Sequence, residues 1–171
     1  MSLNRKLPSS EHILLVDDRP WSVQTIVEAF STAGWRITQK TSLSEGILAL
    51  KSAEYTAAVF DLRLPRPILN ERLELEEMGV PIGWVDSVDE FSVGTVLGRF
   101  VRERLGGQLP FLYISAMALD VSGELGQGAT AGLLVIDKTS SLRDVTLGDE
   151  VLKQVMALID ERGRHLKEDR W

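Results

Sequence analysis

Apolar positions along the chain fall into two alternating patterns. Short apolar runs, each bounded by polar or turn-forming residues, predict buried strands. These runs cover residues 13–16, 36–39, 57–60, 111–114 and 133–136, of which the second is the weakest. The run from Ala57 to Phe60 is fully apolar, as expected for a parallel strand covered on both faces.

Between these runs, apolar residues recur at helical spacing. Ser42 followed by Glu45, and Ser87 followed by Glu90, have the spacing of a capping box at a helix start. The predicted helices run from Pro20 to Gly34, from Ser42 past Leu50, from Ser87 to Gly106 and from Leu147 to Ile159. The stretch 117–131 carries too many glycines to predict a helix.

This alternation of strands and helices predicts one α/β domain with a parallel, doubly wound sheet. Ligands in such folds bind where loops leave the carboxyl ends of the strands. No internal repeat or second domain-sized core is visible in the sequence. The functional residues are therefore expected at the ends of the predicted strands.

Composition narrows the classes of function. The 171 residues include no cysteine and two histidines, which excludes disulfides and thiolate zinc sites and disfavours a histidine-rich metal site. Apolar runs are far shorter than the ~20 residues of a membrane-spanning helix. A net charge of -6 opposes general attraction to nucleic acid. These features predict a soluble, cytoplasmic protein that binds neither nucleic acid nor membrane.

Acidic residues follow two of the predicted strands directly. Asp17 and Asp18 end the first, and Asp61 ends the third. If these strands are neighbours, three carboxylates share one pocket, and two like charges ~4 Å apart repel by about 4 kcal/mol at an effective dielectric of 20. A hard divalent cation relieves this repulsion. Mg²⁺ fits best, because it binds a few carboxylates and completes its coordination with water and phosphate oxygens.

A hydroxyl and an amine follow the last two strands. Ser115 ends the fourth strand, and Lys138 follows the fifth. A hydroxyl donor and an ammonium beside metal-bound carboxylates form a site for a phosphoryl group, whose oxygens need charge neutralisation during transfer. Asp61 is then the predicted nucleophile, which forms an acyl phosphate.

Four segments together resemble the receiver domains of two-component response regulators. They are ILLVDD at 13–18, VFDLRLP at 59–65, LYISA at 112–116 and VIDK at 135–138. The resemblance implies a flavodoxin-like (CheY-like) fold with five parallel strands. It implies a single receiver domain over residues 10–162, with an insertion at about 66–93 and a polar C-terminal tail at 163–171.

The resemblance also implies a role for each matching residue. Asp61 would accept phosphate, Asp18 would bind magnesium directly, and Asp17 would hold it through water. The remaining implied contacts are the backbone carbonyl of Arg63 as a metal ligand, with Ser115 and Lys138 on the phosphoryl group. Such a domain catalyses its own phosphorylation and dephosphorylation but acts on no external substrate.

Partners follow from the same resemblance. The phosphoryl donor would be a sensor histidine kinase or a phosphotransfer protein. With no output domain in the sequence, the signal is expected to pass through protein contacts, either to a downstream protein or to a second copy of the chain as a homodimer.

One departure from the family pattern is an insertion. The family glycine that Gly94 matches stands 33 positions after Asp61, where a short turn is usual. Connections this long are typically functional or structured in their own right. Leu69, Leu73, Leu75 and Met78 predict a short helix among acids, with Trp84 in the loop that follows. Two hypotheses remain: a partner-docking element beside Asp61, or a subdomain that packs its own Leu and Trp side chains.

Two further departures affect the switch. Thr139 follows Lys138 where the family tends to have a proline with a cis peptide, and Val135 replaces an aromatic switch residue. Without proline a cis bond costs about 2.5 to 4 kcal/mol, so another loop geometry is expected. The alternative function is therefore a degenerate receiver that binds proteins independently of phosphorylation. An aspartyl phosphatase is a third hypothesis, but Arg63 occupies the position where such enzymes commonly place a second acid.

Overall fold

Five parallel strands form one sheet in the order β2-β1-β3-β4-β5. The computed structural model describes residues 11–116, 135–138 and 146–168, without the side chains of 166–168. The strands are β1 His12–Val16, β2 Arg36–Lys40, β3 Ala57–Asp61, β4 Phe111–Ser115 and β5 Val135–Asp137. This strand order is that of the flavodoxin-like fold. The predicted doubly wound, five-stranded parallel sheet is confirmed.

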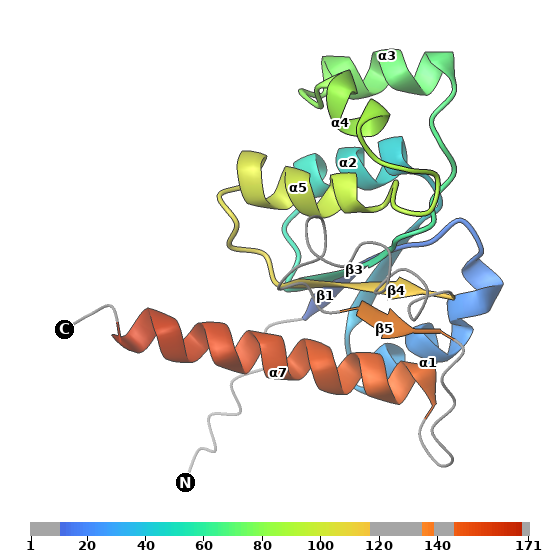
Figure 1. Ribbon diagram of the computed structural model, residues 1–171. Coiled ribbons are helices and arrows are strands. Elements are labelled where there is room, and N and C mark those ends of the chain that lie inside the picture. Colours follow the sequence, from blue (N-terminus) through green and yellow to red (C-terminus); the bar gives the residue numbers. More distant parts are fainter. Residues whose placement is uncertain (1–10, 117–134, 139–145, 169–171) are drawn as a thin grey trace, which may run out of the picture.

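Helices cover both faces of the sheet (Figure 1). The helical elements are η1 Pro20–Val23, α1 Gln24–Thr32, α2 Leu43–Ser52, α3 Leu69–Glu77, α4 Ile82–Asp86, α5 Thr95–Arg104 and α7 Leu147–Glu168. Helices α1 and α7 lie on one face, and α2 and α5 lie on the other. Helices α3 and α4 stack outside α2 and α5 (Figure 1). No helix within the described ranges has the length and apolar character needed to cross a membrane.

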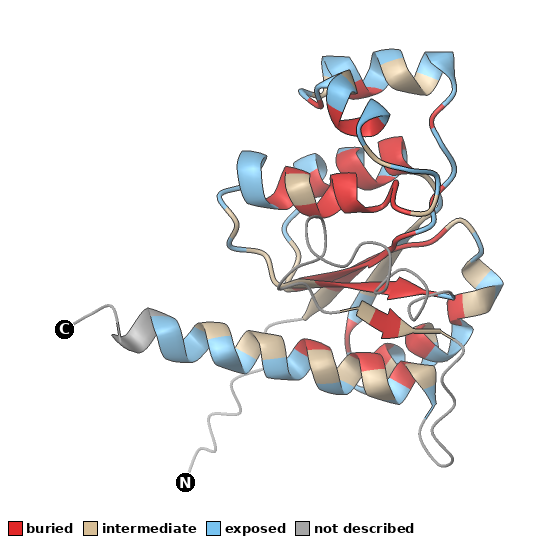
Figure 2. Ribbon diagram, viewed as in Figure 1, coloured by how far each residue is buried: buried red, intermediate tan, exposed pale blue. Residues whose placement is uncertain are grey.

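Alternating residues of the strands build two hydrophobic clusters, one on each face. Leu15 and Val59 point to the side of α1 and α7, whereas Val16 and Phe60 point to the side of α2 and α5. All five residues of β3 are buried, because this strand lies between β1 and β4 in the middle of the sheet (Figure 2). The ends of β1 and β3 are therefore held firmly relative to each other.

Most predicted boundaries differ from the observed ones by a residue or two. Ser42 caps α2 by accepting a hydrogen bond from the Glu45 N–H at 3.2 Å. The Glu45 carboxylate accepts from the Thr41 N–H rather than from the Ser42 N–H, so the predicted capping box is half formed. Helix α7 continues to Glu168, past the predicted end at Ile159 and into the segment expected as a tail. Its extra turns are polar and lacked the apolar spacing used to predict helices.

The predicted start of the third long helix at Ser87 is wrong. Ser87 follows α4, and its hydroxyl donates to the Trp84 carbonyl at 3.1 Å. Asp89 then accepts from the Phe91 N–H at 2.8 Å, which forms a turn and keeps this segment out of helix. Helix α5 begins only at Thr95.

The insertion shares the core of the domain. Leu75, Val80, Trp84 and Val85 are buried in the cluster that also holds the α2 and α5 side chains. The predicted helix among acids is confirmed as α3, but Trp84 lies in α4 rather than in a loop. The insertion therefore packs its Leu75 and Trp84 side chains, as the second hypothesis expected, but it does so against the existing cluster of α2 and α5 rather than in a separate core.

Polar contacts also attach the insertion to the helices beneath it. The Ser44 hydroxyl donates to the Glu71 carboxylate at 3.2 Å, and Lys51 donates to the carbonyl of Met78 at 3.1 Å. The Arg99 guanidinium lies 4.4 Å from the centre of the Trp84 ring, within cation–π range. Both α2 and α5 therefore hold the insertion in place.

The shared core predicts that the insertion and the sheet unfold together. Leu75→Ala removes a fully buried side chain and should lower the free energy of unfolding by about 2 to 5 kcal/mol, measured by urea denaturation. Leu73→Ala, on the same helix but 53% exposed, is the control and should be nearly neutral. Two separate transitions in wild type, with only one moved by Leu75→Ala, would contradict a shared core.

Candidate functional site

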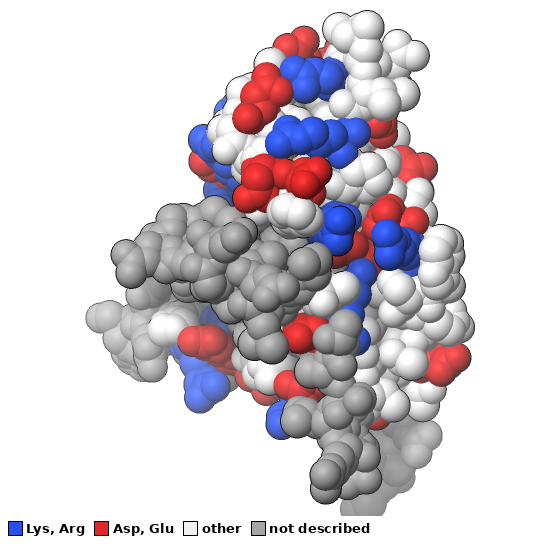
Figure 3. Space-filling model, turned by 45° about the vertical axis from the view of Figure 1, so that its right-hand side comes forward, with Lys and Arg blue, Asp and Glu red and all other residues white. Residues whose placement is uncertain are grey.

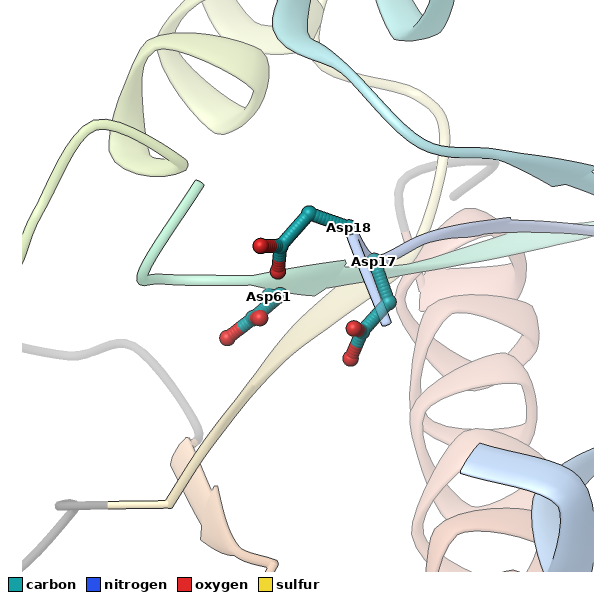
Figure 4. A group of neighbouring side chains, drawn as sticks. All are labelled: Asp17, Asp18 and Asp61. Atoms are coloured by element: carbon teal, nitrogen blue, oxygen red, sulfur yellow. The ribbon is translucent and has the colours of Figure 1, made fainter. Parts of the chain in front are cut away.

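Three carboxylates meet at the carboxyl ends of β1 and β3. Asp17 and Asp18 follow β1, and Asp61 is the last residue of β3. Because β1 and β3 are hydrogen-bonded neighbours, each of the three contributes an oxygen to a group that lies within 4.8 Å (Figure 4). Asp17 and Asp61 are buried, and Asp18 is half-buried. The predicted acidic cluster is present in the structure.

Lys138 lies against two of these acids. Its ammonium is 2.5 Å from Asp17 Oδ2 and 3.1 Å from Asp61 Oδ2. Lys138 follows β5, and its N–H donates to the carbonyl of Ser115 at 2.9 Å, so β4 fixes where this side chain starts. One buried ammonium thus partly neutralises two buried carboxylates.

Backbone N–H groups orient the other oxygens of the same two acids. Arg19 donates to Asp17 Oδ1 at 2.8 Å, and Arg63 donates to Asp61 Oδ1 at 3.1 Å. In both cases the donor stands two residues after the acid, so the turn leaving each strand folds back onto the carboxylate. The turns that follow β1 and β3 therefore hold the Asp17 and Asp61 carboxylates in position before any ligand binds.

Burial dominates the titration of Asp61. Removal from water, followed by the nearby charge of Asp17, raises its pKa to about 6, although Lys138 and the Arg63 N–H act in the opposite direction. The ionised form of Asp61 is thus less favourable than in water. Additional positive charge would stabilise it.

The cluster fits a divalent cation with oxygen ligands. Asp17 Oδ2 is buried, and its contact within the described part of the chain is the Lys138 ammonium. Carboxylate oxygens that are crowded and incompletely bonded are suitable ligands for Mg²⁺. Asp17, Asp18 and Asp61 could hold this ion, and the carbonyl of Arg63 stays a predicted further ligand.

Of the remaining predicted residues, Ser115 lies at the same edge of the sheet. Ser115 is the buried last residue of β4, and the adjacent strand β5 carries Val135 at its start. Val135 is half-buried and packs against the cluster of α2 and α5. The phosphoryl contact of Ser115 stays a prediction, and the peptide bond to Thr139 falls outside the described residues.

A pocket of about 350 Å³ opens above Asp61. Its described lining comes from the exits of β1, β3 and β4, from Lys138 and from the insertion: Asp18, Arg19, Asp61, Arg63, Leu64, Pro65, Arg66, Glu90, Ala116 and Lys138. Figure 3 shows basic and acidic side chains gathered on this face below the insertion. Most residues that line the pocket are therefore charged, as suits an anionic group bound with a cation.

Sequence reasoning missed three residues near the site. Arg66 and Glu90 line the pocket from the two ends of the insertion, and the Ser22 hydroxyl lies 3.5 Å from the Lys138 ammonium. Arg66 and Glu90 belong to no strand end, so only the placement of the insertion reveals them. Ser22 lies in the turn after the Asp17 and Asp18 pair, and that closeness was its one signal in the sequence.

The sequence by itself matches no family model and no curated protein. Solved structures are similar in fold. A response regulator receiver protein from Sinorhizobium medicae superposes with a TM-score of 0.59 at 20% identity, covering 90% of this chain and 98% of that one. The receiver domain of a sensor histidine kinase from Pseudomonas aeruginosa, with magnesium coordinated in its active-site cleft, gives 0.57 at 19% identity, covering 89% and 99%.

A third similar structure contains both Mg²⁺ and BeF. The response regulator from Thermotoga maritima in complex with Mg²⁺ and BeF has a TM-score of 0.51 and 18% identity, covering 86% of this chain and 98% of that one. All three similarities extend over nearly the whole length of the known domain. They show that this chain has the CheY-like receiver fold, as its sequence motifs predict.

The raised pKa of Asp61 predicts that its charge destabilises the metal-free protein. The folded form holds its proton up to about pH 6, whereas the unfolded form loses it near 3.8, so stability falls as pH rises through this window. Asp61→Asn should therefore raise the free energy of unfolding by about 2 to 3 kcal/mol at pH 8 in a chelating buffer. The gain should vanish below about pH 4.

Thermal unfolding from pH 3.5 to 8 measures this effect. Asp160→Asn, an exposed acid on α7, is the control and should show no comparable gain. An Asp61→Asn gain that is the same at pH 3.5 and pH 8 would contradict an electrostatic origin.

Proposed function

We propose that this protein is a response regulator that accepts a phosphoryl group on Asp61 from a histidine kinase or phosphotransfer protein. The observation that supports this most is the convergence of Asp17, Asp18, Asp61 and Lys138 at one edge of a receiver-type sheet. A surface cluster of acids would not bury two carboxylates against one ammonium. A cytoplasmic location and output through protein contacts, to a downstream protein or a second copy, belong to the same proposal.

Asp61 acts as the nucleophile. One of its carboxylate oxygens attacks the phosphorus, the phosphorus–nitrogen bond of the donor phosphohistidine breaks, and an acyl phosphate forms. Lys138, already 3.1 Å from Asp61 Oδ2, shifts from the carboxylate to a phosphoryl oxygen. Ser115, at the end of the adjacent β4, donates its hydroxyl to another phosphoryl oxygen.

Mg²⁺, when bound by the three carboxylates and the Arg63 carbonyl, supplies the positive charge that offsets the phosphoryl oxygens. The backbone and the burial of the site contribute the rest. The Arg19 and Arg63 N–H groups keep Asp17 and Asp61 oriented, and burial keeps competing water away from the Asp61 carboxylate. The site is therefore prepared before the phosphoryl donor arrives.

The switch differs from the family pattern at Val135. A branched aliphatic side chain replaces the aromatic ring, so movement of a ring cannot carry the signal. This departure is the reason to retain the alternative of a binding module that works without phosphate. The paired Lys138 and the buried Asp61 favour the phosphoacceptor, because a passive module has no need of buried charges that destabilise the fold.

Direct labelling tests the proposal. Wild-type protein incubated with Mg²⁺ and phosphoramidate should gain the mass of one phosphoryl group, detected by intact mass spectrometry. Asp61→Asn should gain none, whereas the exposed-acid control Asp160→Asn should react as wild type does. Treatment with hydroxylamine should remove the label, because it cleaves acyl phosphates. A hydroxylamine-resistant label, or labelling of Asp61→Asn, would contradict the assignment.

Fluorescence separates the phosphoacceptor from the passive module. Trp21 lies in η1, three residues beyond Asp18, and is 75% exposed. Mg²⁺ with beryllofluoride should change its emission in wild type and leave Asp61→Asn unchanged, with Trp21→Phe identifying the reporting residue. No response in wild type, combined with normal folding, would favour the passive module.

A further inference from the structure

The far end of the insertion forms one wall of the pocket above Asp61. Glu90, 29 positions after Asp61 in the chain, lines this pocket together with Asp61 itself. No strand end and no receiver motif accounts for an acid at this place. The insertion therefore adds a carboxylate to the phosphoacceptor site.

Hydrogen bonds hold this wall in position. The Arg66 guanidinium donates to the carbonyls of Val85, at 3.1 Å, and Val88, and so ties the start of the insertion to its far end. Asp89 Oδ1 accepts from the Phe91 N–H at 2.8 Å and from the Ser92 hydroxyl at 2.9 Å. Residues on both sides of Glu90 are thus fixed.

Two further contacts attach the same segment to the exit of β3. The Gly94 N–H donates to the carbonyl of Leu62 at 2.8 Å, and a Cβ at position 94 would lie 1.8 Å from the Asp61 carbonyl oxygen. The Arg63 guanidinium lies 4.9 Å from the centre of the Phe91 ring. Glu90 is therefore positioned relative to Asp61 through the residues that follow each of them.

The different exposure of Asp61 and Glu90 shows which of the two acids lies deeper in the pocket. Asp61 is 3% exposed at the floor of the pocket, whereas Glu90 is exposed at its rim. A phosphoryl group on Asp61 extends from the floor toward the rim. Water that displaces Asp61 in line must approach the phosphorus from the side opposite the aspartyl oxygen, which is the open side of the pocket.

We propose that Glu90 is the catalytic base of dephosphorylation and so sets the lifetime of the phosphorylated state; this rests on the proposed function. Glu90 accepts a proton from the attacking water, whose oxygen forms a new bond to phosphorus. The bond between phosphorus and the Asp61 oxygen breaks, which releases inorganic phosphate and the Asp61 carboxylate. Glu90 then returns its proton to solvent.

The negative charge of Glu90 also acts on the phosphoryl group directly. A carboxylate at the rim repels a phosphoryl group, but Arg63, Arg66 and Lys138 line the same pocket and offset this effect. A positioned base typically accelerates a reaction 10²- to 10⁴-fold, and the amide of Gln keeps part of the water-orienting ability. Glu90→Gln should therefore slow hydrolysis by about tenfold or more.

The experiment follows decay of the label after phosphorylation. Wild type, Glu90→Gln and Glu76→Gln are phosphorylated with phosphoramidate and Mg²⁺, the donor is removed, and the label remaining is measured by mass spectrometry over time. Glu76, exposed on α3 of the same insertion, is the matched control and should decay as wild type does. The rate of labelling should be unchanged in Glu76→Gln, which lies outside the pocket.

Arg66 provides a second variant. Arg66→Ala releases the carbonyls of Val85 and Val88 and should also slow decay, because Glu90 is no longer held in place. If Arg66 acts through Glu90, adding Glu90→Gln to Arg66→Ala should change the rate little. Independent, multiplying effects would overturn this positioning role.

Each outcome of the decay measurements either supports or overturns the proposal. Slower decay in Glu90→Gln alone among the two Glu variants supports the proposal. Decay equal to or faster than that of wild type overturns it. If wild type takes no label at all, the proposed function fails and this inference falls with it, whereas normal labelling with unchanged decay removes only Glu90.

Discussion

The buried pairing of Lys138 with Asp17 and Asp61 is the interaction on which the site depends. Two carboxylates and one ammonium lie at an edge of the sheet where water is largely excluded, which leaves a local excess of negative charge. The fold tolerates this excess because the hydrophobic clusters on both faces hold β1 and β3 side by side. Stability gained in the core is thus used to keep reactive groups close together.

The insertion extends that arrangement rather than standing apart from it. Leu75 and Trp84 complete the cluster of α2 and α5, while Arg66 and Glu90 reach the pocket. The docking hypothesis remains open for the outer face of α3, where Leu69 is 71% exposed. The same segment can therefore support the core on one side and line the site on another.

Much of the fold and the site was predictable from the sequence, because strand ends are local signals. An apolar run that stops at Asp17 or Asp61 predicts both a strand and the edge of the sheet at which the acidic side chain lies. The start of α5 and the place of Trp84 were not predictable, since side-chain bonds of Ser87 and Asp89 override the capping pattern. The place of Glu90 in the pocket wall depends on tertiary packing across the insertion. The spacing of residues along the sequence does not reveal such packing.

The hydrogen bond from the Gly94 N–H to the Leu62 carbonyl bears on whether the insertion could be shortened. It brings the two ends of the insertion together, so a short turn could in principle replace everything between them. Removing the segment would nevertheless uncover the apolar side chains of α2 and α5 that Leu75 and Trp84 now shield. Although its two ends already meet, the insertion therefore cannot be deleted without exposing apolar surface to water.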